Sequence, residues 1–415
     1  MTSVSGLRSA GLAPRLLVLF AIVLALLGSL GMNCQTGGGS NAPRGGDDDS
    51  SDDDTSDDTG DDDGVIPPGA IVDTDGDVGK YSSLELVGGD PATAHVSYYG
   101  DGVGLKFALE NATGWQIDVI DGTSAAIGLY SSMRLDSGEN AHIAYYDKTN
   151  GHLKVAEGTI DAGWDIVVVD DGAGTGPGGT DADVGAYSFL DLSPGEDPMV
   201  AYYDGSNKYL KFAERTAGTW EVQVVDDSTD VGTYCSIGHE RSEGTVYVAY
   251  YDAHNGALKM ATRSGASWAV QTVDAGSSTD PVGQWTSVQV DTMGNQHIAY
   301  YDVGKQNLKY AWFLLGGENW TVTTLDSDGY VGADARLAID LQSQPVIIYQ
   351  DQDNVDVKLA RRQGSNWSVS SLLTDGPYGF WMSLELDTHG NPVFSHYQPL
   401  KKYLLIYPPR EDTTE

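Results

Sequence analysis

The sequence predicts an all-β protein made of seven repeated units, and three observations lead to that prediction. A Val-Gly-type pair recurs about every 50 residues, apolar and polar residues alternate after each pair, and no sustained helical period appears beyond residue 64. The pairs are Val78-Gly79, Ile127-Gly128, Val184-Gly185, Val231-Gly232, Val282-Gly283, Val331-Gly332 and Tyr378-Gly379. A period of this length is typical of four-stranded propeller blades.

Each complete unit contains four strand-like runs. In the second unit they cover residues 132–135, 141–147, 153–157 and 164–170. Two turn segments rich in Asp, Asn and Gly separate the first three runs, and these residues adopt positive φ at low cost. We therefore expect three consecutive hairpin-connected strands and a fourth, outermost strand that begins with a tryptophan.

The seventh unit is incomplete, and this predicts how the repeats close. It has three runs, at residues 382–386, 393–397 and 403–407, but no tryptophan run. Residues 69–73 at the other end match the missing one. We predict a seven-bladed β-propeller over residues 69–407, with its last blade completed by an N-terminal strand, because closure removes open sheet edges. The alternative, an open solenoid, needs capping repeats and would not split one unit between the termini.

The acidic composition restricts the classes of partner that the protein can bind. Residues 1–64 hold three arginines and eleven aspartates, so −29 of the formal charge of −37 lies on residues 65–415. Such a surface repels phosphate backbones, which argues against nucleic-acid binding. It suits a neutral or cationic partner, or multivalent cations.

The N-terminus reads as a targeting segment that is separate from the fold. Residues 1–34 form a leader with a short apolar run, and residues 35–68 form a Gly- and Asp-rich tether expected to be disordered. Cys34 after the apolar run resembles the lipidated cysteine of a bacterial lipoprotein signal, although Gly31-Met32-Asn33 departs from the usual residues before it. Lipidation of Cys34, cleavage near Gly31 and an uncleaved anchor stay open. All three predict export to the cell envelope or surface, with membrane contact only through this anchor. Residues 408–415 are expected to be a C-terminal tail.

Two features recur in nearly every unit, which favours a structural role for both. One is the tryptophan that begins the outermost strand, which we expect to pack on the neighbouring strand. The other is a Tyr-Tyr-Asp signature followed by a lysine, so that Asp147 and Lys154 would form an exposed pair across a hairpin. The tryptophans are Trp115, Trp164, Trp220, Trp268, Trp320 and Trp367.

The second residue after each Val-Gly pair is the candidate ligand contact. Seven blades would bring these residues round the mouth of a central channel, where aromatic rings can stack on a sugar or hold a cation. The alternative is that each ring is wedged between adjacent blades. The residues are Tyr81, Tyr130, Tyr187, Tyr234, Trp285, Asp334 and Trp381.

The sixth unit departs from this pattern. Asp334 and Arg336 replace the Tyr and Ser of the sister units, and a departure from an internal repeat is a place to expect function. Cys235 replaces a serine nearby and is expected to be a small buried residue.

A calcium site is the one metal site that the sequence suggests; no other cofactor is expected. Asp73, Asp75 and Asp77 place carboxylates at alternate positions, which calcium can use. They lack the glycine and glutamate of the calcium-hand loop, and Asp and Gly are also ordinary turn residues.

Residues 291–302, Asp-Thr-Met-Gly-Asn-Gln-His-Ile-Ala-Tyr-Tyr-Asp, resemble the repeats of exported bacterial β-propellers grouped with the sialidase-like superfamily. The resemblance covers residues 69–407 and implies a fold. It does not imply an activity, because the arginine triad and Asp-box of sialidases are missing. The Arg and Glu of fungal fucose-binding propellers do not repeat here either.

The functional expectation is a surface-tethered, non-catalytic binding propeller that recognises a glycan or protein partner. The sequence contains no Gly-x-Ser-x-Gly, His-Glu-x-x-His or phosphate-binding glycine motif. Two alternatives remain: an extracellular polysaccharide hydrolase or lyase that uses carboxylates near Asp334, and a structural component of an envelope or matrix.

Overall fold

The computed structural model describes residues 69–122, 126–173, 183–241, 244–374 and 376–409. All of them belong to one compact unit, Ile66–Glu415. The expected leader, tether and lipidated Cys34, and the last residues of the expected tail, lie outside the described residues. Within the described ranges, no helix is long and apolar enough to cross a membrane.

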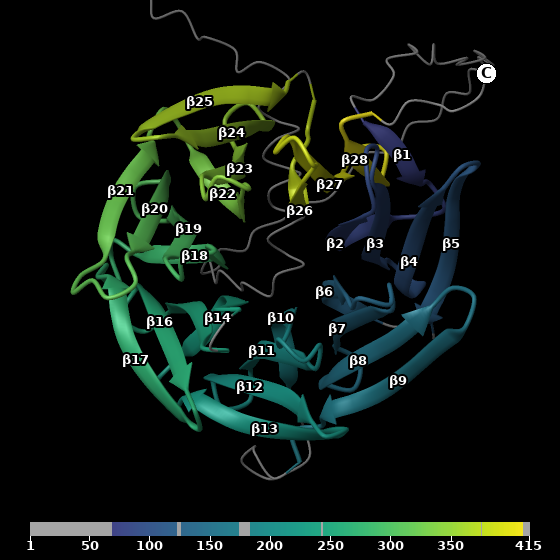
Figure 1. Ribbon diagram of the computed structural model, residues 1–415, viewed down its shortest axis with the longest axis horizontal. Helices are drawn as coiled ribbons and strands as arrows, with labels where there is room; N and C mark the ends of the chain where they lie inside the picture. The colour runs from purple at the N-terminus through teal and green to yellow at the C-terminus, as the bar shows by residue number, and fades with distance from the viewer. Residues whose placement is uncertain (1–68, 123–125, 174–182, 242–243, 375, 410–415) are drawn as a thin grey trace, which may run out of the picture. The chain divides into compact units, whose positions relative to one another are not determined.

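The described residues form seven antiparallel sheets of four strands, which follow one another round a ring (Figure 1). The strand bounds are as follows. Blade 1 has β2 (Val78–Val87), β3 (Thr93–Gly100), β4 (Gly104–Asn111) and β5 (Gly114–Asp121); blade 2 has β6 (Ile127–Leu135), β7 (Ala141–Asp147), β8 (His152–Thr159) and β9 (Gly163–Asp170); blade 3 has β10 (Val184–Leu192), β11 (Pro198–Asp204), β12 (Tyr209–Thr216) and β13 (Thr219–Asp226); blade 4 has β14 (Val231–His239), β15 (Val246–Asp252), β16 (Ala257–Ser264) and β17 (Ser267–Asp274). Blade 5 has β18 (Val282–Val290), β19 (Gln296–Asp302), β20 (Asn307–Phe313) and β21 (Thr321–Asp326); blade 6 has β22 (Val331–Ile339), β23 (Pro345–Asp351), β24 (Asp356–Gln363) and β25 (Asn366–Leu373); blade 7 has β26 (Phe380–Leu386), β27 (Pro392–Gln398), β28 (Tyr403–Tyr407) and β1 (Ala70–Asp73).

Blade 7 confirms the predicted closure. Its strand order is β1-β28-β27-β26, and Ala70 lies opposite Ile406. Between blades 7 and 1, the Ser82 hydroxyl donates to the carbonyl of Trp381 at 2.8 Å. The seven-bladed β-propeller with an N-terminal closing strand is therefore present, and the open solenoid is excluded.

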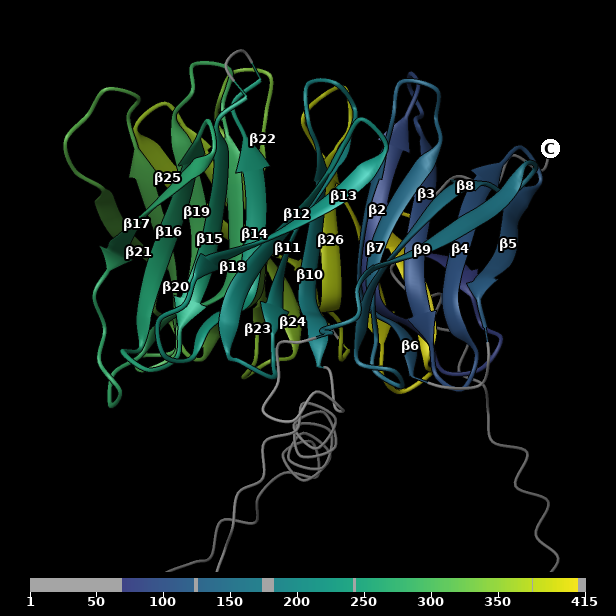
Figure 2. The same ribbon diagram turned by 90° about the horizontal axis from the view of Figure 1, so that it is seen from below.

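The strands run between two faces of the ring, as Figure 2 shows from the side. We call the first face the one where innermost strands begin and outermost strands end, and the second face the opposite one. β1 begins and β28 ends at the second face, because Ala70 and Ile406 are paired there. The chain therefore enters and leaves the ring at its second face.

The Val-Gly pair is explained by close contact between blades. Gly185 has φ +113°, and a Cβ there would lie 2.8 Å from the Cα of Leu153 in the preceding blade. Any side chain would therefore require both a disfavoured backbone conformation and a displaced neighbour. The pair marks the start of each innermost strand for this reason.

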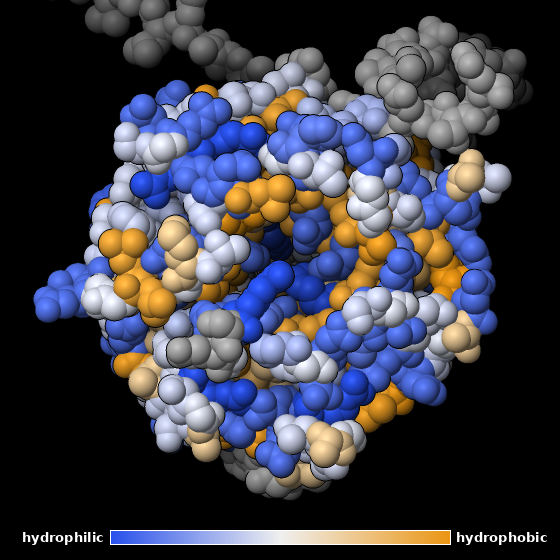
Figure 3. Space-filling model, viewed as in Figure 1, coloured by the Kyte–Doolittle hydropathy of each residue, from blue (hydrophilic) through white to orange (hydrophobic). Residues whose placement is uncertain are grey.

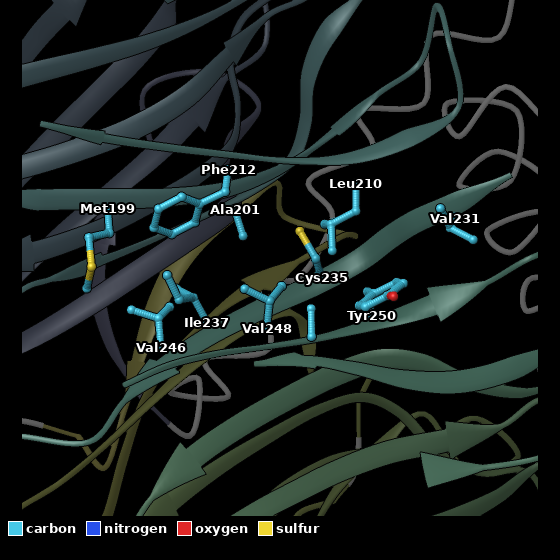
Figure 4. Packing of buried hydrophobic residues seen from close by; sticks show 11 residues of the cluster. Met199, Ala201, Leu210, Phe212, Val231, Cys235, Ile237, Val246, Val248 and Tyr250 are labelled. Carbon is cyan, nitrogen blue, oxygen red and sulfur yellow. The ribbon is translucent and has the colours of Figure 1, made fainter. Parts of the chain in front are cut away.

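The hydrophobic core lies between adjacent blades. Figure 4 shows one cluster, in which Met199 and Phe212 of blade 3 face Ile237 and Val248 of blade 4. Trp268 packs on this cluster, with its ring 5.1 Å from that of Phe212. This contact supports the structural role expected for the repeated tryptophans.

The Tyr-Tyr-Asp signature builds a second kind of contact between blades. The first tyrosine is fully buried, and its hydroxyl donates to an aspartate that ends the outermost strand of the preceding blade. A lysine of the tyrosine's own blade binds the same carboxylate. The six triads are Tyr98–Asp73–Lys106, Tyr145–Asp121–Lys154, Tyr202–Asp170–Lys211, Tyr250–Asp226–Lys259, Tyr300–Asp274–Lys309 and Tyr349–Asp326–Lys358.

These triads correct one expectation. Lys154 does reach Asp147 across its own hairpin, at 2.8 Å, but the Asp147 side chain is fully buried. The predicted pairing is therefore present, but its predicted exposure is wrong, because the lysine also turns inward toward Asp121 of the preceding blade, 3.1 Å away.

Candidate binding site at the innermost strands

The seven candidate residues occupy one equivalent place in each blade. Tyr81, Tyr130, Tyr187, Tyr234, Trp285, Asp334 and Trp381 all have positive φ, between 49° and 56°. The pairing register shifts just before this place, as between Ile127 and Leu129, and again across it, as between Leu129 and Ser132. Each innermost strand therefore bulges here. Because the unfavourable left-handed backbone conformation recurs in all seven blades, contacts with neighbouring residues must stabilise it.

Six aromatic rings touch in sequence and form what we call the aromatic collar. The ring centroids of Tyr81 and Tyr130, and those of Tyr130 and Tyr187, are 4.7 Å apart. Tyr187–Tyr234, Tyr234–Trp285 and Trp381–Tyr81 follow at 4.8, 5.0 and 5.3 Å. All six side chains are partly exposed, and Tyr81 and Tyr130 also pack against the buried Tyr99, Leu129 and Tyr146 of blades 1 and 2.

The collar tyrosines stay protonated at neutral pH. Burial raises the pKa of Tyr81, Tyr130 and Tyr234 above the ordinary value. Their hydroxyls are therefore neutral hydrogen-bonding groups, able to donate to or accept from a polar ligand.

Small hydrogen-bond donors hold the collar backbone in place. In five blades the third residue after the pair donates to the carbonyl of the collar residue in the preceding blade. Ser131 donates to Tyr81 at 2.6 Å, and Ser188 donates to Tyr130 at 2.7 Å. Cys235 is buried, as expected, and its thiol lies 3.0 Å from the carbonyl of Tyr187 in the same arrangement.

The hydrogen bond from the third residue is missing at blades 6 and 7, and Asp334 and Arg336 make other hydrogen bonds in its place. Ala335 and Met382 hold the donor position in blades 6 and 7 but have no hydroxyl. Asp334 accepts from the main-chain N–H of Met382 at 2.8 Å, and Arg336 donates to the Met382 carbonyl at 2.6 Å. Arg336 Nη2 also lies 2.8 Å from Asp334 Oδ1. The pair lies in the gap of the collar and joins blades 6 and 7.

A second set of tyrosines surrounds the collar toward the first face. These are the second tyrosines of the Tyr-Tyr-Asp signature, and each packs against a collar ring; Tyr146, for example, lies 6.4 Å from Tyr130. Several donate to acids at the first face: Tyr146 to Asp183 at 2.5 Å and Tyr203 to Asp230 at 3.2 Å. This mouth of the ring is therefore both aromatic and acidic.

The three aspartates proposed as calcium ligands make different contacts in the structure. Asp73 belongs to a buried triad, and Asp75 donates its main-chain N–H to Asp73 at 2.9 Å. Asp77 accepts from Tyr397 at 2.7 Å and from Lys80 at 3.0 Å. Burial alone would raise the pKa of Asp77, but these hydrogen bonds lower it. Among the described residues, no three acidic, His or Cys side chains are grouped so as to hold a metal ion.

The sequence interpretation missed a charged cluster near the second face. Arg134 lies 2.7 Å from Glu85 and 3.6 Å from Asp191, and His239 lies 2.8 Å from Asp191. Burial, and then the charge of Glu85, raise the pKa of the nearby Glu385 to about 8.

A signal for this cluster exists in the repeat. The sixth residue after each pair varies in charge from one blade to the next, which a purely structural position would not require. The face seen in Figure 3 is hollowed at the centre of the ring, with hydrophilic residues inside the hollow. The sixth residues are Glu85, Arg134, Asp191, Gly238, Gln289, Ala338 and Glu385.

No protein-family model and no curated protein sequence matches this chain. Among solved structures, a PL25 ulvan lyase is 14% identical, covers 82% of this chain and 93% of its own, and has a TM-score of 0.53. A PL25 ulvan lyase bound to -[GlcA(1-4)Rha3S]- is also 14% identical. It covers 83% of this chain and 93% of its own, with a TM-score of 0.53. AofleA from Arthrobotrys oligospora is 14% identical over 74% of this chain and 95% of its own, with a TM-score of 0.48. At these identities the likeness to the lyases shows a shared propeller fold.

Proposed function

We propose that this protein is a non-catalytic binding propeller that holds a glycan against the aromatic collar. The collar carries the proposal, because it is a continuous arc of partly exposed aromatic rings on which sugar rings can stack. Neutral tyrosine hydroxyls add the polar contacts that orient a ligand in an otherwise apolar site.

The topology suits a tethered protein. The collar lies toward the first face, whereas β1 begins and β28 ends at the second face. With an anchor expected in residues 1–34, a chain entering at the second face leaves the collar mouth free for a partner outside the cell. This surface location is part of the proposal.

The collar offers no obvious catalytic pair. An acid and a base must be free to exchange protons with the substrate. Asp334 and Arg336, the charged residues in the gap of the collar, are engaged with each other and with the backbone of Met382. This arrangement favours binding over turnover at the collar.

A glycan array followed by calorimetry tests the proposal on the full chain. We expect a glycan ligand whose affinity falls about tenfold or more in Tyr130→Ala and in Trp285→Ala, since each loses a stacking surface. Circular dichroism melts of both variants control for folding. Absence of any glycan ligand, or unchanged affinity in both folded variants, would refute the proposal.

The second candidate is a polysaccharide hydrolase or lyase, and one observation favours it. Glu385 has a pKa near 8, so it is protonated at neutral pH and can act as a general acid near Glu85 and Arg134. The test is turnover of the glycans that the array identifies. Product formation that Glu385→Gln abolishes would favour this candidate, and its absence with wild-type protein would exclude it for those glycans.

A further inference from the structure

Lys80 shows how this fold holds an ammonium group at the first face. Its Nζ lies 3.0 Å from Asp77, 3.6 Å from Asp101 and 5.7 Å from the ring centroid of Tyr397. The Tyr397 hydroxyl donates to the other oxygen of Asp77 at 2.7 Å. A tyrosine of one blade and the aspartate that precedes the next blade thus form a frame for a cation, combining an ion pair with a cation–π contact.

The same frame recurs between blades 2 and 3, but without the lysine. Asp183 lies three residues before Ala186, as Asp77 lies three residues before Lys80. Tyr146 donates to Asp183 at 2.5 Å, and Ala186 packs in the cluster that contains Tyr146. The Asp183 main chain is fixed as well, because its N–H donates to Ser206 at 2.9 Å. Ala186 therefore stands where the Lys80 side chain stands in blade 1.

This frame differs from the equivalent frames between other blades in that its carboxylate, Asp183, has no lysine partner among the described residues. Between blades 3 and 4, Lys208 of blade 3 lies 3.2 Å from Asp230, and in blade 2 the apolar Leu129 packs beside Tyr99. Asp183 is exposed, and no Lys, Arg or His among the described residues forms an ion pair with it. The surrounding unit carries a formal −29, so the local field favours a positively charged guest.

We propose that the Tyr146–Asp183 frame binds the ammonium group of an amino sugar. The proposal rests on glycan binding at the collar and adds the ligand class. The collar rings of Tyr130 and Tyr187 adjoin the frame, since Tyr130 lies 6.4 Å from Tyr146 and 4.7 Å from Tyr187. A sugar stacked on these rings brings its amino group within reach of Asp183.

The test compares two ligands that differ only in the amino group. Binding of a glucosamine oligosaccharide and of an N-acetylglucosamine oligosaccharide of equal length is measured by calorimetry on the full chain at pH 6, where the amines are protonated. We expect the glucosamine form to bind about tenfold or more tightly. A uronate oligosaccharide should bind more weakly than either.

Three variants test whether the preference for the glucosamine oligosaccharide arises at Asp183. Asp183→Asn should remove it by removing the carboxylate, and Ala186→Lys should remove it by placing an internal ammonium in the frame, as in blade 1. Asp165→Asn is the matched control, because it deletes the same charge from the exposed part of β9, on the outer side of blade 2. It should leave both affinities unchanged. Thermal melts verify that each variant is folded.

The outcomes separate this inference from the proposed function. Equal affinity for the two oligosaccharides, or a preference that persists in folded Ala186→Lys, overturns the ammonium site but leaves glycan binding intact. Equal losses in Asp183→Asn and Asp165→Asn also overturn it, since they would show only a general charge effect. Failure to bind any glycan overturns both proposals. This holds even if a protein partner is found at the first face.

Discussion

The hydroxyl of Tyr98 in blade 1 donates to the carboxylate of Asp73 in the closing strand β1, at 2.7 Å. Lys106 binds the same carboxylate at 2.5 Å, and all three side chains are buried. The N-terminal strand therefore completes the last blade and also supplies the counter-charge for a lysine of the first blade.

Asp73→Asn should destabilise the propeller markedly. The change leaves the Lys106 ammonium buried without its carboxylate, and breaking such a pair costs about 3–5 kcal/mol. Urea denaturation followed by tryptophan fluorescence measures the effect. Asp75→Asn is the control, because Asp75 is exposed and its change should stay within about 0.5 kcal/mol. Equal midpoints for the two variants would show that Asp73 does not hold the ring closed.

The strands were largely predictable from the sequence because their side chains alternate and their turns are marked. The run at residues 141–147 coincides with β7, and the run at residues 403–407 coincides with β28. The innermost strands were predicted too short: residues 132–135 are only the end of β6 (Ile127–Leu135). Tyr130 has positive φ within that strand, and no local residue pattern marks a strand that continues through such a bulge.

Contacts between blades were harder to predict than the blades themselves. Lys154 does pair with Asp147 of its own hairpin, but the pair is buried, and the second partner, Asp121 of the preceding blade, was not expected. The collar position was found because the repeat aligns it, whereas its packing depends on how far each blade is rotated from the next. The cluster round Arg134 was missed because Glu85, Arg134 and Asp191 are equivalent in position but different in charge.

Stability should decline below about pH 4 through the buried triads. Burial alone would raise the pKa of Asp226, but hydrogen bonds from Lys259, Ser228 and Tyr250 lower it to about 2. The unfolded chain binds this proton near pH 3.8, so the stabilisation is complete above that value and is lost as pH falls to about 2. The shift corresponds to about 2 kcal/mol.

Asp226→Asn tests this acid dependence. The variant should be less stable at pH 6 and should lose less further stability between pH 4 and 2 than the wild type. Urea midpoints at successive pH values provide the comparison. Parallel curves for the two proteins would mean that Asp226 titrates alike in the folded and unfolded states.

His396→Phe should stabilise the protein. His396 takes the place of the buried tyrosine in blade 7, but Leu373 and Leu405 replace the aspartate and lysine of its triad. Both ring nitrogens are buried without a hydrogen-bond partner. Removing buried, unpaired polar atoms should raise the free energy of unfolding by about 1–3 kcal/mol, measured at pH 7. His389→Phe, at an exposed site, should change little.

The same variant should flatten the pH dependence between about 6.5 and 3. Burial lowers the pKa of His396 to about 3, so the folded protein resists a proton that the unfolded chain accepts near pH 6.5. The wild type therefore loses stability as pH falls through this range, and His396→Phe lacks this contribution. Wild-type stability that stays constant from pH 6.5 to 4.5 would contradict the burial of a neutral His396.

Asp334 and Arg336 should act as a unit in stability. Arg336→Ser leaves the Asp334 carboxylate buried without its guanidinium, and Asp334→Tyr leaves Arg336 without its carboxylate. Each single change should destabilise the protein. The double variant restores the residues of the sister blades and should lose less than the sum of the two. Because Arg336 is 28% exposed, solvent screens the pair, and we expect a coupling of about 1–2 kcal/mol in a double-mutant cycle. Additive losses would show that the two residues serve blade 6 independently, and that the gap in the collar is not held by their ion pair.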